Sequence, residues 1–141
     1  MAGETILIVE DNERNLKLAR DVLRFHGYQT IEARSAEEGL ELARTRQPAL
    51  VLMDIQLPGM DGIQALRRLR DDPATRRIPV LALTASAMSH DRARIREAGF
   101  DGYLPKPISL GELVAEIERL LDAATRAASD APAGDPGDGA G

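Results

Sequence analysis

Three acidic residues and two residues suited to phosphate follow short apolar runs, where they could form one site. Glu10 and Asp11 follow the first run, Asp54 ends the third, and Thr84 and Lys106 come at or after the last two. Crowded carboxylates need a counter-cation, and oxygen ligands favour a hard ion such as Mg²⁺, with Mn²⁺ as a substitute. A hydroxyl and an ammonium group are phosphate-binding groups. These residue types predict a metal-dependent site for in-line phosphoryl transfer, with Asp54 as the nucleophile.

The elements that must position these residues follow from an alternation of five apolar runs with five amphipathic stretches. The runs are 5–9, 29–33, 50–54, 79–84 and 101–104. Such alternation is typical of βα units around a parallel sheet. The sequences ILIV, LVLM and VLAL are continuously apolar, which indicates central strands covered on both faces. The other two runs are more polar, and the last leads into Pro105, so we expect them at the edges.

Right-handed crossovers wind such a chain most simply in the strand order 2-1-3-4-5. This is the doubly wound, flavodoxin-like α/β fold with helices on both faces of the sheet. The chain reverses direction between the first and third strands, and ligands bind beyond the carboxyl ends of the strands at that point. The predicted fold therefore brings Glu10, Asp11 and Asp54 together, with Thr84 and Lys106 beside them.

Capping residues and apolar spacing indicate the helices. The candidate starts are Ser35, Asp61 and Ser109, and the candidate glycine stops are Gly27 and Gly99. In the first helix, the apolar stripe should contain Leu16, Ala19, Leu23 and His26. The stretch 89–98 is mostly polar, so its helix should pack loosely and be available to a partner.

Bulk properties limit the classes of function. The chain has 141 residues, 43% of them apolar and 29% charged, which fits one globular domain. Its net charge of −5 argues against direct nucleic-acid binding. Since it has no Cys, no long apolar run and no signal-type start, we expect a cytoplasmic protein without membrane insertion. The domain should span 4–122, and the Ala/Gly/Pro/Asp-rich region 123–141 should be a frayed helix end and a disordered tail.

Four blocks at the ends of the predicted strands carry a family resemblance. They read ILIVEDN, LVLMDIQLPGMDG, VLALTASAM and GYLPKPI, in this order. Together they resemble the receiver domain of two-component response regulators, the CheY-like superfamily, over residues 4–121. The single-domain length and the segments VEDNERNLKL, MDIQLP, ALTASAM and KPIS are most similar to DivK-like single-domain receivers.

The resemblance implies a role for each matching residue. Asp54 would accept a phosphoryl group from the phosphohistidine of a histidine kinase or histidine phosphotransfer protein, so the chain would signal rather than act as an enzyme. Mg²⁺ would be bound by Glu10, Asp11, Asp54 and the Gln56 main-chain carbonyl. The phosphoryl oxygens would be bound by Thr84, Lys106 and the Ala85 amide. The peptide bond between Lys106 and Pro107 would be cis. Many receivers carry Asp where this chain has Glu10, so that side chain could reach the metal through water.

A conformational switch is also implied by the resemblance alone. Thr84 would move toward the phosphoryl group and Tyr103 would swing inward, changing the surface formed by the fourth helix, fifth strand and fifth helix. This surface would bind a downstream protein, and phosphorylation-dependent dimerisation is one possible outcome.

Structural interpretations compete with some of these assignments. Asp54 could merely cap a helix, and Tyr103 could be an ordinary half-buried strand aromatic. For Asp61 the favoured interpretation is a helix cap rather than a ligand. The remaining candidates, which we interpret as structural, are His26, His90, Met53, Met60 and Met88.

Three other functions remain as alternatives. A haloacid-dehalogenase-like, Mg²⁺-dependent phosphatase also uses an Asp after a strand, but it needs a second Asp two residues later, where this chain has Gln56. A degenerate receiver that binds partners constitutively is disfavoured because every expected polar group is present. The chain could also be the receiver part of a larger hybrid kinase or regulator.

Overall fold

The computed structural model describes residues 3–57, 59–85, 89–106 and 109–129, and within them strands and helices alternate along the chain. The strands are β1 (Thr5–Val9), β2 (Gln29–Ala33), β3 (Leu50–Asp54), β4 (Val80–Thr84) and β5 (Gly102–Pro105). The helices are α1 (Glu13–Phe25), α2 (Ala36–Arg46), α3 (Gly62–Asp71), α4 (Ser89–Ala98) and α5 (Leu110–Ser129).

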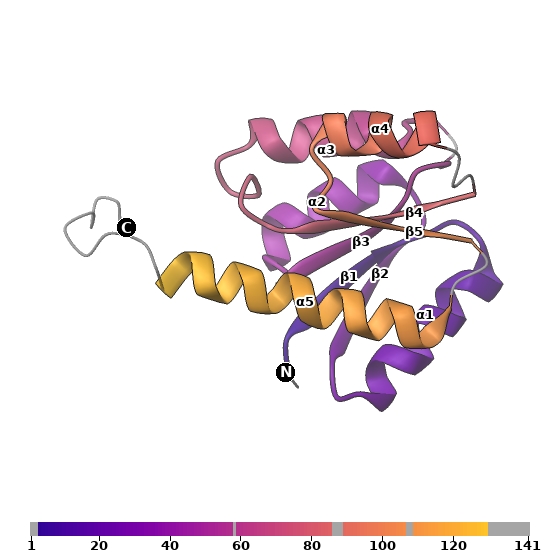
Figure 1. Cartoon of the computed structure of the whole chain (residues 1–141), viewed down its shortest axis with the longest axis vertical. Coiled ribbons are helices and arrows are strands. Elements are labelled where there is room, and N and C mark those ends of the chain that lie inside the picture. Colours follow the sequence, from indigo (N-terminus) through magenta and orange to yellow (C-terminus); the bar gives the residue numbers. More distant parts are fainter. Residues whose placement is uncertain (1–2, 58, 86–88, 107–108, 130–141) are drawn as a thin grey trace.

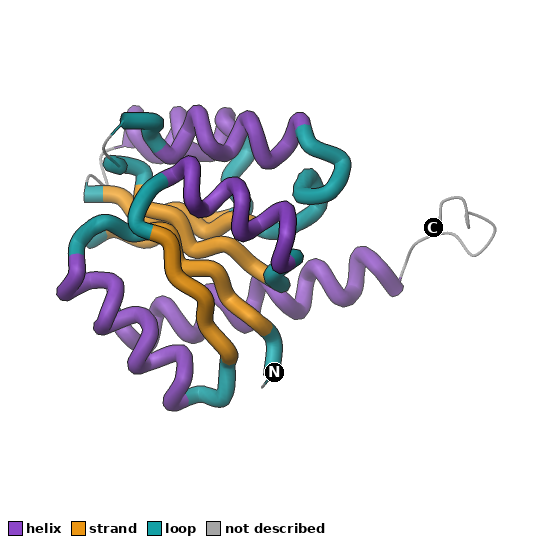
Figure 2. The backbone as a smooth tube through the Cα atoms, turned by 180° about the vertical axis from the view of Figure 1, so that it is seen from behind, coloured by secondary structure: helices purple, strands orange, loops and turns teal. Residues whose placement is uncertain are grey.

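All five strands are parallel and pair in the order β2-β1-β3-β4-β5, which confirms the predicted doubly wound fold. The helices form two layers: α1 and α5 cover one face of the sheet, while α2, α3 and α4 cover the other (Figures 1 and 2). The expected edge strands, β2 and β5, lie at the two edges. Because α2 connects β2 to β3 across β1, the chain changes direction beside β1 and β3, as the site prediction requires.

The central strands are apolar at every position because each face of the sheet has its own core. In β1, Ile6 and Ile8 pack toward α1 and α5, while Leu7 and Val9 pack toward the opposite helices. All four side chains are fully buried. Successive strand residues point to opposite faces, so a strand in a sheet that is covered on both sides needs apolar residues at odd and even positions alike.

Helix ends mostly match their sequence signals. The Ser35 hydroxyl accepts a hydrogen bond from the Glu38 amide at 3.2 Å, and Asp61 and Gln64 form a complete capping box. The glycines that follow α1 and α4 have positive φ angles of 92° and 108°. The expectation for His26 was wrong: this side chain is exposed, because α1 ends at Phe25 and His26 caps it.

Helix α5 begins directly after Ser109 and continues through Ser129, past the boundary expected at residue 122. Its C-terminal turns extend beyond the strands (Figure 1). The tail expected from residue 130 onward lies outside the described residues. Among the helices that the structure describes, none has both the length and the apolarity needed to cross a membrane.

Candidate functional site

The three acidic residues lie together at the C-terminal ends of the strands, which we call the carboxyl edge of the sheet. Asp54 is the last residue of β3, and Glu10 and Asp11 directly follow β1, which pairs with β3. Glu10 and Asp54 are only 1% and 2% exposed, whereas Asp11 is exposed. One carboxylate oxygen from each residue lies within 4.8 Å of the other two. The structure thus brings together the carboxylates that the topology predicted to converge.

Lys106 enters the same crevice from the end of β5. Its ammonium nitrogen lies 2.7 Å from Asp54 Oδ2 and 3.5 Å from Glu10 Oε1. The Lys106 amide donates a hydrogen bond to the Thr84 carbonyl oxygen at 2.7 Å, which joins the ends of β4 and β5. Thr84 is itself 5% exposed. The hydroxyl-bearing residue and the ammonium group are therefore held beside the carboxylates by neighbouring strands.

Burial and crowding determine the electrostatics of this crevice. Burial raises the pKa of Glu10 from its usual 4.5 to about 7; a hydrogen bond from the Asn12 amide opposes the rise, and the charge of Asp54 adds to it. Burial alone would lower the pKa of Lys106, but the hydrogen bond and charge of Asp54, together with the charge of Glu10, raise it overall. Lys106 thus stays cationic and offsets part of the negative charge.

The donor set fits a hard divalent cation. Glu10 Oε2 accepts a hydrogen bond from the Asn12 amide at 3.0 Å, but the buried Glu10 Oε1 has no hydrogen-bond partner. Asp54 Oδ1 accepts from the Gln56 amide at 3.0 Å. The Lys106 ammonium nitrogen, 3.5 Å away, is too far for a strong hydrogen bond to this oxygen, and a cation held by Glu10, Asp11 and Asp54 would satisfy it. The oxygen-only donor set is the kind that Mg²⁺ prefers.

Two residues support the site without having been identified as functional from the sequence. Asn12 caps α1 by accepting the Asn15 amide at 3.0 Å, while its own amide orients Glu10. Gly62 begins α3 so close to β3 that an added Cβ would lie 2.8 Å from the Asp54 carbonyl oxygen. Two features of the sequence could have indicated these roles: an Asn lies directly before the acidic first turn of α1, and a Gly follows the Asp61 cap directly.

The structure also shows the positions of three other predicted site residues, Gln56, Ala85 and Tyr103. Gln56 is adjacent to the carboxylates through its amide, and Ala85 is exposed directly after Thr84. Tyr103 is half-buried on β5, and its hydroxyl accepts a hydrogen bond from Arg92 at 3.4 Å. The predicted cis peptide involves Pro107, which lies outside the described residues.

Comparison with known families gives a match over most of the chain. Residues 6–118 match the response regulator receiver domain. The chain belongs to this family. The five parallel strands in the order β2-β1-β3-β4-β5 are therefore the fold of a receiver domain.

Both sequence relatives and solved structures support the family assignment. Over 118 residues, the chain is 48% identical to the polar-differentiation response regulator DivK of Brucella ovis, covering 84% of this chain and 96% of the relative. Among solved structures, it resembles the receiver domain of the sensor histidine kinase PA1611 from Pseudomonas aeruginosa, with a TM-score of 0.79, 36% identity, and 86% and 99% of the two chains covered. That receiver has magnesium coordinated in its active-site cleft. A CheY-like receiver from Methanospirillum hungatei gives a TM-score of 0.81 at 29% identity, with coverage of 89% and 98%.

Proposed function

We propose that this receiver is a single-domain response regulator of a cytoplasmic phosphorelay and that Asp54 is its phosphoryl acceptor. The observation that carries the proposal is the buried Asp54 carboxylate, held 2.7 Å from the Lys106 ammonium nitrogen at the switch point of the sheet. The DivK relatives, which this chain covers almost completely, support the single-domain assignment. A histidine kinase or histidine phosphotransfer protein would be the donor, and the chain would act as a signalling domain rather than as an enzyme.

The transfer would be an in-line displacement at phosphorus. An Asp54 carboxylate oxygen forms the new O–P bond while the N–P bond of the phosphohistidine breaks, and the imidazole leaves with that electron pair. Lys106, the Thr84 hydroxyl and the Ala85 amide would hold the phosphoryl oxygens. The donor loses the phosphoryl group and Asp54 gains it as an aspartyl phosphate, so no further reactant is needed.

Mg²⁺ is the metal that we propose for the acidic crevice, with Mn²⁺ as a substitute. Asp11, Asp54 and the Gln56 carbonyl would hold it, and Glu10 would contact it directly or through water. Bound there, the ion would neutralise negative charge on the transferring group. Two observations support this assignment: the buried Glu10 Oε1 accepts no hydrogen bond, and the PA1611 receiver has magnesium in its active-site cleft.

The output would be a change in the surface of α4, β5 and α5. Only one of the described side chains of α4, Ile95, is buried, so this helix has little apolar anchorage. Tyr103 is half-buried beside it and is linked to Arg92 by a single long hydrogen bond. We propose that Thr84 moves toward the phosphoryl group, that Tyr103 turns inward, and that the altered surface binds a downstream protein or a second phosphorylated copy.

The central test is phosphorylation by a small donor. Phosphoramidate, which has a P–N bond like that of phosphohistidine, should label the wild type in the presence of Mg²⁺ but not in EDTA. The Asp54→Asn variant should remain unlabelled, as read by intact mass spectrometry. Equal labelling of the Asn variant would refute the assignment of Asp54.

Tyrosine fluorescence can test the switch separately, because the chain has two Tyr residues and no Trp. Beryllofluoride should change the emission of the wild type, whereas the Tyr103→Phe variant, which retains the buried Tyr28, should show no change. Lys106→Ala should still accept a phosphoryl group but should not give the fluorescence change. A full response from either variant would contradict the proposed switch.

A further inference from the structure

A second charged pocket lies at the N-terminal ends of β4 and β5, on the side of the sheet that we call its amino edge. It has a volume of about 400 Å³, within the range of roughly 300–1,000 Å³ that is usual for small-molecule sites. Its walls come from the loop before β4, the loop before β5 and the C-terminal half of α5. Asp54 and Thr84 lie at the other ends of their strands, so this pocket is separate from the phosphorylation site.

The polar wall contains two arginines that are available to a ligand. Arg76 and Arg77 both line the pocket and both are exposed. Neither forms an ion pair with any residue in the described part of the chain. The acidic residue of the pocket, Asp101, is already engaged by Arg70 at 2.8 Å and by the Val80 amide at 2.8 Å. The pocket therefore retains an excess of positive charge.

The loop that carries these arginines is held in place before any ligand binds. Arg70 donates hydrogen bonds to the Arg76 and Ile78 carbonyl oxygens at 3.0 and 2.8 Å. The buried Thr75 hydroxyl donates to the Leu69 carbonyl oxygen at 2.7 Å, and the Gln47 side chain donates to the Ala74 carbonyl oxygen at 2.9 Å. A preorganised loop loses less conformational entropy when it binds a ligand.

The apolar part of the lining comes mainly from α5. Leu120 is buried, and Ala123 and Ala124 contribute small side chains. Pro79 completes the apolar surface. All three α5 residues lie after residue 118, where the match to the receiver family ends. The pocket thus includes a part of α5 that lies beyond the family match.

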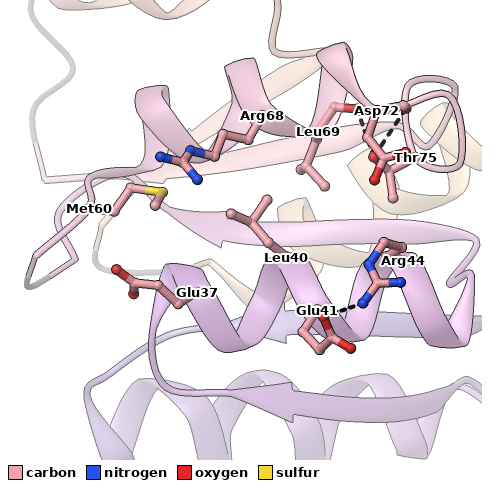
Figure 3. Close-up of a pocket in the computed structure, with 9 residues that line it drawn as sticks. All are labelled: Glu37, Leu40, Glu41, Arg44, Met60, Arg68, Leu69, Asp72 and Thr75. Atoms are coloured by element: carbon pink, nitrogen blue, oxygen red, sulfur yellow. Dashed lines mark hydrogen bonds and ion pairs between the residues drawn. The ribbon is translucent and has the colours of Figure 1, made fainter.

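The hollow between α2 and α3 provides a contrast (Figure 3). It has a similar volume of about 400 Å³, and Leu40 and Leu69 face each other across it. Its lining includes three acidic residues and two arginines, and Arg44 is already paired with Glu41 at 2.5 Å. This hollow has no excess of positive charge, so it does not select an anion.

We propose that the pocket beside Arg76 and Arg77 binds a nucleotide. The two guanidinium groups would hold the phosphate, since Arg is suited to bidentate phosphate recognition. The base and sugar would lie against Pro79, Leu120 and the two alanines of α5. A free phosphate would use only the polar wall, and a nucleoside only the apolar one, so the nucleotide should bind more tightly than either.

The proposal is tested by calorimetric titration of the full chain with AMP, ADP, GMP and GDP, with adenosine and inorganic phosphate as the two partial ligands. At least one nucleotide should bind with a Kd below about 1 mM. The Arg76→Gln/Arg77→Gln double variant should bind it at least about tenfold more weakly, because hydrogen bonds to charged groups are lost. The Arg67→Gln/Arg68→Gln double variant is the matched control, since it loses the same charge from exposed α3 residues outside the pocket.

A second variant tests the apolar wall with the arginines intact. Ala123→Trp should fill the space next to α5 and abolish nucleotide binding, while circular dichroism and phosphorylation at Asp54 stay unchanged. Failure of every nucleotide to bind would overturn the proposal. So would equal weakening by the α3 control variant, or binding of inorganic phosphate as tight as that of the best nucleotide.

Discussion

The carboxyl edge of the sheet carries buried acidic residues, whereas the amino edge carries exposed basic residues. At the carboxyl edge, Glu10 and Asp54 are almost fully buried, and their charges are balanced in part by Lys106. At the amino edge, Arg76 and Arg77 are exposed on a loop that is fixed by bonds to other residues. Buried charges interact strongly with one another and with the fold, whereas exposed charges are screened by water. Changes at the carboxyl edge should therefore alter stability and function together, and changes to the exposed arginines should alter binding alone.

The largest effect should come from Glu10→Gln in metal-free buffer. The pKa of Glu10 is about 7 in the folded protein and 4.5 in its unperturbed state, so the folded state binds the proton more tightly. This stabilisation is present below pH 4.5 and is lost as the pH rises through 7, at a cost of roughly 3 kcal/mol. The Gln side chain cannot ionise, so urea denaturation in EDTA at pH 5 and pH 8 should show a smaller loss of stability in the variant.

Added Mg²⁺ sharpens this experiment. If the ion binds the ionised carboxylates, it should restore stability to the wild type at pH 8 and have less effect on Glu10→Gln. Equal pH dependence in the two proteins would show that burial of Glu10 does not control this part of the stability.

The next effect should come from Gly62→Ala, which changes no charge. The new methyl group would lie 2.8 Å from both the Asp54 carbonyl oxygen and the Ile55 Cα, which are backbone atoms. Such overpacking should destabilise the fold by about 1–3 kcal/mol and slow phosphorylation by displacing Asp54. Gly111→Ala is the matched control: this helical glycine has nothing within 4 Å of an added Cβ, so the change should be neutral or slightly stabilising. Equal melting temperatures for the two variants would contradict the close approach.

The carboxyl edge was predictable from the sequence because topology alone determines it. Parallel strands place their carboxyl ends at one edge, so the positions of Asp54, Thr84 and Lys106 followed once the five apolar runs were recognised. The depth of burial of Glu10 was not predictable in this way. It depends on how the Asn12 cap turns the chain after β1, and the sequence of the cap does not show which carboxylate oxygen is left without a hydrogen bond.

The amino edge was not predictable, because loops and a helix end build it. In the sequence, Arg76 and Arg77 were a short basic pair, and the region after 122 was expected to be a frayed helix end. The structure extends α5 through Ser129, and Leu120 and Ala124 line the same pocket as those arginines. Contacts between residues more than 40 positions apart have no periodic signal in the sequence.

A smaller effect on stability should follow from Arg70→Met, which keeps an apolar stem but removes the guanidinium group. Arg70 bonds to three carbonyl oxygens and to Asp101, so its loss should cost about 1–2 kcal/mol in urea denaturation. Arg119→Met is the control, because the Arg119 side chain is exposed and its salt bridge to Glu116 is an i,i+3 pair within one helix, worth about 0.5 kcal/mol or less. If both variants lost the same stability, Arg70 would not be the anchor of this edge.

The smallest effect on stability should come from the Arg76→Gln/Arg77→Gln variant. Both side chains are exposed and make no ion pair in the described part of the chain, so unfolding free energy should change by less than about 0.5 kcal/mol. Phosphorylation of Asp54 should be unchanged, because the two edges are separated by the length of the strands. A loss of stability above that limit would mean that the arginines support the loop itself. The carboxyl and amino edges would then no longer differ in whether their charged residues support the fold.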